Sequence, residues 1–248
     1  MKNRLACGFL ALSVVSLAAC SETAGPDGSH SQVKSLVTLD IAMVSADALI
    51  DDLAELQLTF VGGLGGAFAA PPPDRTRTVT FYDAAGNEQE AHDGATTASI
   101  HIVSEFSGGR GRGNWSGSVS RERDMTISGL EGDETTRIAN GTGNSTVSRS
   151  RHNDEDGDRS YDMSGTSLIT DVVHGVPRDE NRYPLSGTVT RDVTVVVVNG
   201  PNGDVTRNKH VVTTFDGTKF ATLSVDGESF EVDLSTRDGR HPLRNRGR

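Results

Sequence analysis

A two-residue alternation of apolar and polar side chains runs through most of residues 76–236, and it constrains the fold more than any other feature of the chain. Successive side chains of a β-strand point to opposite faces of its sheet, so alternation predicts strands with one buried and one hydrated face. Segments rich in Gly, Asn and Asp separate the alternating runs and indicate turns. The expected strands are 76–83, 97–106, 114–128, 134–150, 159–173, 185–198, 204–215, 218–225 and 228–235.

The turns between these strands are short, which predicts an all-β fold, an antiparallel meander of long hairpins. The clearest hairpin signal is Asp226-Gly227, a two-residue turn in which Ala221, Leu223 and Val225 face Phe230, Val232 and Leu234. Apolar residues make up 34% of the chain, which suits a sheet with one wet face. Both an open sheet and a barrel-like closure fit the pattern.

Residues 36–73, which precede the alternating runs, have a different sequence pattern. We expect a short strand at 36–43 and then a short amphipathic helix at 45–58, with Asp47 as its N-cap and Leu49 and Leu53 on its apolar stripe. This stripe would dock on the sheet, whereas the acidic opposite face disfavours a membrane surface. A Gly/Pro-rich linker follows at 61–73, so we place the β-domain at 74–236.

The first twenty residues have a positive start at Met1–Arg4, a short apolar run at Leu5–Leu17, and then Leu17-Ala18-Ala19-Cys20. This segment resembles the signal peptide and lipobox of bacterial lipoproteins. The resemblance implies that 1–19 is removed, that Cys20 is the lipid attachment site, and that 20–35 is a flexible tether. Ser21 after the cysteine favours the outer membrane, facing the periplasm or the cell surface. The alternative is an ordinary secretory signal in which Cys20 occurs by chance.

The net charge argues against one class of binding partner, and the cysteine content argues against a disulfide. The formal net charge is −10 at pH 7, which argues against nucleic-acid binding because that depends on neutralising phosphates. The two cysteines are Cys7, in the segment to be removed, and Cys20. No disulfide is therefore expected in the mature chain, and packing and sheet hydrogen bonds must stabilise it.

A short Val-x-Arg pattern recurs in several expected strands, as at Val119-Ser120-Arg121, Val147-Ser148-Arg149, Val189-Thr190-Arg191 and Val205-Thr206-Arg207. Residues two apart share a face, so one face combines valines with cations while Ser, Thr, Asp and Glu dominate the other. Such a surface suits an anionic amphiphile. The simpler interpretation is that the arginines pair with acids across neighbouring strands while their stems cover apolar surface.

No catalytic motif is present, so the sequence predicts no enzyme and no cofactor. Asp154, Asp156 and Asp158 begin a calcium-loop pattern that lacks the later glycine and glutamate, so we expect an acidic hairpin tip and no metal site. We expect Ser107–Gly113 to be a flexible loop and the arginine-rich residues 237–248 to be a disordered basic tail. The sequons at Asn114, Asn140 and Asn144 carry no weight in a bacterium.

These observations favour a lipid-anchored cell-envelope protein with a non-catalytic structural or binding role. One alternative is a carrier that holds a lipid or other hydrophobic ligand in a curved β-sheet. Another is an envelope hydrolase with an unrecognised site. The expected partners are the membrane, through the N-terminal lipid, and an anionic envelope lipid or glycan.

Overall fold

The computed structural model describes the β-domain and part of a helix that precedes it. The described residues are 75–112, 115–151, 159–177, 180, 182–200 and 203–235, together with Thr38, Ile41, Ala42, Ser45, Ala46, Leu49, Ile50 and Leu53. Cys20, Asp47, the linker at 61–73, the loop at 154–158 and the tail at 237–248 lie outside these residues.

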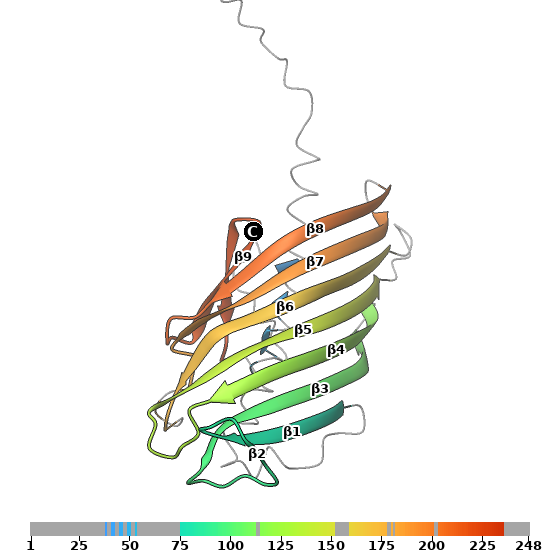
Figure 1. Ribbon diagram of the computed structural model, residues 1–248. Coiled ribbons are helices and arrows are strands. Elements are labelled where there is room, and N and C mark those ends of the chain that lie inside the picture. The colour runs from blue at the N-terminus through green and yellow to red at the C-terminus, as the bar shows by residue number, and fades with distance from the viewer. Residues whose placement is uncertain are drawn as a thin grey trace, which may run out of the picture.

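Ten antiparallel strands form one sheet (Figure 1). Their bounds are β1 Arg75–Asp83, β2 Glu88–Gln89, β3 Thr97–Arg112, β4 Trp115–Ser128, β5 Thr136–Arg151, β6 Arg159–Gly175, β7 Ser186–Gly200, β8 Gly203–Thr214, β9 Phe220–Val225 and β10 Glu228–Asp233. The spatial order is β10-β9-β8-β7-β6-β5-β4-β3-β1-β2, so neighbours in the sheet are almost always neighbours in the chain. This confirms the predicted all-β meander.

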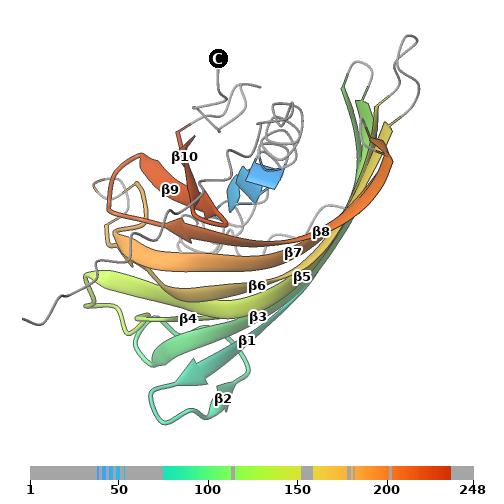
Figure 2. The same cartoon turned by 90° about the horizontal axis from the view of Figure 1, so that it is seen from above.

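The sheet is open, which decides between the two architectures that the sequence allowed. β2 and β10 lie at its two ends and do not pair with each other. The long strands bend along their length, so the sheet has an inner and an outer side (Figure 2). All nine expected strands are present, with shifts of at most two residues at their ends except for β3, which runs further than expected. β2 was not predicted, because two residues are too few to show alternation.

The β9–β10 hairpin has the turn that its sequence predicts. Asp226 has φ 48° and Gly227 has φ 90°, the left-handed backbone that a two-residue turn requires. Leu223 lies opposite Phe230 across the hairpin. Figure 1 shows this hairpin leaving the direction of the longer strands at one end of the sheet.

Two sequence-based predictions are wrong. Thr38, Ile41 and Ala42 are helical, whereas a strand was expected at 36–43 and a helix only from 45. The buried residues of this helix follow the i, i+3, i+4, i+7 pattern of one helix face, namely Thr38, Ile41, Ala42, Ser45, Ala46, Leu49 and Leu53. A run of eight residues is too short for period alone to separate helix from strand.

The second error concerns the glycine-rich segment at 107–113. Ser107–Arg112 is the end of β3 and pairs with β4 as far as the partners Arg112 and Trp115. Cross-strand hydrogen bonds hold this segment in the sheet although its glycines weaken a strand intrinsically.

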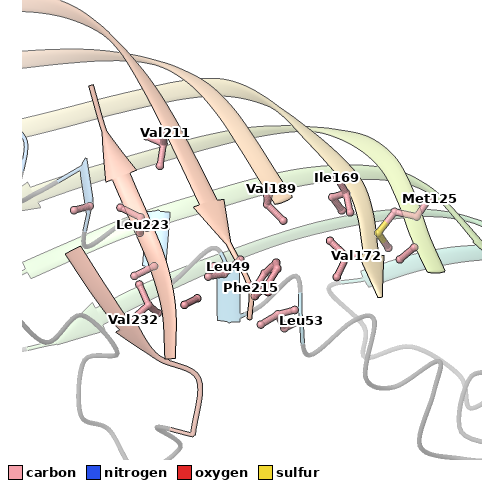
Figure 3. Packing of buried hydrophobic residues seen from close by; sticks show 14 of the residues in the cluster. Leu49, Leu53, Met125, Ile169, Val172, Val189, Val211, Phe215, Leu223 and Val232 are labelled. Carbon is pink, nitrogen blue, oxygen red and sulfur yellow. The ribbon is translucent and has the colours of Figure 1, made fainter. Parts of the chain in front are cut away.

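The helix and the sheet share one hydrophobic core. Ile41, Ala46, Leu49 and Leu53 belong to the same buried cluster as residues of the strands. Leu49 and Leu53 lie beside Phe215 on the inner side of the sheet (Figure 3). The predicted docking of the helix on the sheet is therefore confirmed for the described residues. Within the described part of the chain, no helix is long and apolar enough to cross a membrane.

Candidate functional site

The two faces of the sheet differ in charge along its long strands. Cross-strand partners share a face, so the register assigns a face to each position in 75–82, 99–109, 116–128, 136–150, 160–170, 188–198 and 203–214. Every lysine and arginine at these positions lies on the inner face, namely Arg75, Arg77, Arg121, Arg123, Arg137, Arg149, Arg191, Arg207 and Lys209. Every acid at these positions lies on the outer face, namely Glu105, Glu122, Asp124, Asp162, Asp192 and Asp204.

The inner cations gather in two neighbouring rows that cross the sheet. One row of directly opposed partners is Arg77, Ser104, Arg123, Gly143, Ser167 and Arg191. The next row is Arg75, Phe106, Arg121, Ser145, Gly165, Val193 and Lys209. Adjacent strands are ~4.8 Å apart, so each row is a band of cations, small residues and apolar side chains.

Arg123 shows how the fold accommodates a buried cation. It is 3% exposed, and its Nη1 donates to the carbonyl oxygens of Glu122, at 2.8 Å, and Asn144, at 3.3 Å. Gly143 is the partner of Arg123 on β5, and a Cβ there would collide with the Arg123 guanidinium. The missing side chain at Gly143 therefore makes room for the arginine.

None of the face-assigned positions above places an acid on the inner face. The predicted pairing of the inner-face arginines with acids across neighbouring strands stays a prediction. Lys209 pairs with Asp226 of the β9–β10 turn, at 2.6 Å from Nζ to Oδ2. The hydrogen bond from Lys209 lowers the pKa of Asp226, as do the His210 backbone N–H and the nearby positive charge.

Apolar rows flank the cationic rows, and much of this inner face is filled. Met163 is 4% exposed and Val195 is 0% exposed, and both belong to the one hydrophobic cluster. Arg75 lies over the Phe106 ring, 5.5 Å from its centroid, which shows a cation covering apolar surface as the sequence predicted. Phe106 and Val193 themselves are only half-buried.

The outer face is hydrated and rich in hydroxyl and amide groups. One complete row across β3–β8 is Ser107, Ser120, Thr146, Ser164, Thr194 and Asn208. Two histidines on this face bind acids of the next strand, His101 with Asp124 and His210 with Asp192, both at 2.7 Å. Both pairs are exposed, as expected of a solvated sheet surface.

The sheet also leaves strand edges open. β9 pairs with β8 only at Val211–Thr214, and the backbone N–H of Asp226 donates to the His210 carbonyl at 2.9 Å. Among the described residues no strand pairs with the remaining side of Gly203–Lys209, which we call the β8 edge. On the other side of the sheet, β2 pairs with β1 only at Phe81 and Tyr82. An open edge presents backbone N–H and C=O groups to another chain.

The predicted attachment residue Cys20 and the acidic loop at Asp154–Asp158 lie outside the described residues. Within the part of the chain that the structure describes, no group of three His, Cys, Asp or Glu side chains could hold a metal ion. The separation of charges could have been found from the sequence by marking the face of every charged residue in the alternating runs. The β8 edge could not, because it depends on where β9 stops pairing.

The sequence matches no protein-family model, and no curated protein or solved structure is significantly similar to it.

Proposed function

We propose that this chain is a lipid-anchored cell-envelope protein with a non-catalytic binding or structural role. The observation that carries the proposal for the β-domain is the packing of its inner face. Residues from the helix and from most of the strands form a single buried cluster there. A sheet that buries its inner face against its own chain leaves its outer face and its edges for contacts with other molecules.

The lipid anchor is proposed from Leu17-Ala18-Ala19-Cys20 alone. Replacing Cys20 with Ala in the full-length chain removes the thiol that would form the lipid thioether. We expect wild-type protein in a bacterial host to incorporate labelled palmitate and to sediment with membranes. The C20A variant should do neither, while Cys7→Ala, a matched change in the segment to be removed, should behave as wild type. Palmitate incorporation by the C20A variant would refute the anchor.

A carrier of an anionic amphiphile is the second candidate, and a specific observation favours it. Half-buried Phe106, Arg121, Val193 and Lys209 share one inner row, and this mixture suits a lipid chain with an acidic headgroup. The filled rows beside it argue against the carrier, since a carrier must keep space for its ligand.

Native mass spectrometry separates the two functions. We expect C20A protein purified without detergent to carry no stoichiometric lipid. About one lipid per chain, lost in Val193→Asp, would make transport the better proposal.

A further inference from the structure

The β8 edge is the longest open strand edge that the structure describes. β8 continues past the point where β9 leaves it (Figure 1), so Gly203–Lys209 pairs with β7 on one side only. This edge differs from a flat apolar one, because polar side chains alternate with cations over residues 206–209. Thr206 and Asn208 lie on the outer face, and Arg207 and Lys209 lie on the inner face.

The structure already contains one acidic residue beside this edge. The Asp226 backbone N–H donates to the His210 carbonyl, and the Asp226 carboxylate accepts from the His210 backbone N–H at 3.0 Å. The same carboxylate accepts from Lys209 Nζ at 2.6 Å. An acid that continues the sheet next to β8 therefore bonds both the backbone edge and an inner-face cation.

Arg207 is the next inner-face cation along the edge, two residues before Lys209, and it is exposed. Its Nη1 donates to the carbonyl of Thr206 at 3.1 Å, which leaves other guanidinium N–H groups available, because an arginine has five. An acid beside Arg207 would repeat what Asp226 does beside Lys209.

The charges along the edges also select the partner. β1, another open edge, carries Arg75 and Arg77 on the inner face. Two copies joined through β8 and β8, or through β8 and β1, would bring like charges together, which destabilises a strand pair. A strand with acids at alternate positions faces no such repulsion.

We propose that the β8 edge binds an extended acidic peptide segment of another protein by strand addition, with one of its carboxylates paired to Arg207. Backbone hydrogen bonds give such a complex its affinity, and the alternating side chains give it specificity. The partner's acids would lie on the inner face beside Arg207 and its polar residues beside Thr206 and Asn208. This inference deepens the binding role proposed above and is independent of the lipid anchor.

The test uses the full-length chain carrying C20A and a fluorescent peptide of alternating threonine and glutamate. A peptide of about seven residues spans Gly203–Lys209 at ~3.4 Å per residue. We expect saturable binding by fluorescence anisotropy that weakens with salt. Arg207→Glu should weaken binding at least tenfold and create binding of the matching threonine–lysine peptide. Arg182→Glu, which changes an exposed loop arginine by the same charge, should leave both results as in the parent protein.

Two further measurements separate strand addition from general charge attraction. In an added strand, only every second residue directs its backbone N–H toward β8. N-methylation of those residues removes the hydrogen bonds to β8 and should abolish binding, whereas N-methylation of the residues between them should not. Arg207→Gln, which removes the charge without reversing it, should weaken binding without creating affinity for the lysine peptide. Any of three results would overturn the proposal. These are equal losses of peptide affinity in the Arg207 and Arg182 variants, equal binding of both methylated series, and no saturation at about 1 mM peptide. Failure here leaves the palmitate result for Cys20 unaffected.

Discussion

Leu49→Ala tests whether the N-terminal helix is part of the folded core. Leu49 is fully buried and lies on the inner side of the sheet beside Leu53 and Phe215 (Figure 3). It belongs to the same cluster as strand residues. If the helix docks there, the substitution removes three side-chain carbons from a closely packed site and leaves a cavity.

The expected cost follows from that burial. Truncating a buried leucine to alanine costs about 2–5 kcal/mol, the spread reflecting how far the site can collapse. For a domain of this size such a loss lowers Tm by roughly 4–20 °C. Ile50 is the matched control, because it is the next residue of the same helix and is only half-buried. Ile50→Ala should therefore cost clearly less.

The measurement is urea unfolding of the C20A chain followed by far-UV circular dichroism, with calorimetry for Tm. We expect a lower midpoint for Leu49→Ala with an unchanged m-value, since the exposed surface changes little. A midpoint equal to that of the parent chain, or equal losses for Leu49→Ala and Ile50→Ala, would refute the docking of the helix on the inner face.

Three further outcomes follow from the structure. Gly141→Ala should destabilise the fold by about 1–3 kcal/mol, because the new Cβ would lie 2.8 Å from Met125 Cα. Gly109→Ala is the control, because no atom lies nearer than 3.8 Å to its new Cβ, and it should be near neutral in the same urea titration. The Asp226 carboxyl has a lowered pKa in the folded chain, so its contribution to the free energy of unfolding is present above its ordinary pKa of 3.8 and is lost as pH falls through the folded value. Asp226→Asn should therefore flatten the fall in Tm below about pH 4. An unchanged slope of Tm against pH would contradict this. Millimolar calcium should not shift Tm, whereas a shift of several degrees that Asp156→Asn abolishes would reveal a site in that loop.

The strands and their faces follow from the sequence because alternation is a local property. Val119, Arg121, Arg123 and Met125 share one face whatever their neighbours are, and the register confirms that face as the inner one. The Asp226-Gly227 turn is equally local, since two residues with positive φ fix a tight hairpin.

Other features depend on contacts between distant segments, and only the tertiary structure decided them. β3 continues through Arg112 because β4 supplies hydrogen bonds to a glycine-rich run that would not hold a strand by itself. Thr38 is helical in a segment where a short alternation also fits a strand, and packing on the inner face favours the helix.

Some features of the candidate site also follow from the sequence, and others depend on the tertiary structure. The sequence determined which residues are cationic and which side of a strand they occupy, because side-chain direction alternates along any extended chain. It did not determine that Gly143 leaves room for Arg123, that the sheet stays open, or that Gly203–Lys209 has a free side. Those facts depend on register and on where β9 stops pairing with β8, and hydrogen bonds between segments far apart in the chain fix both.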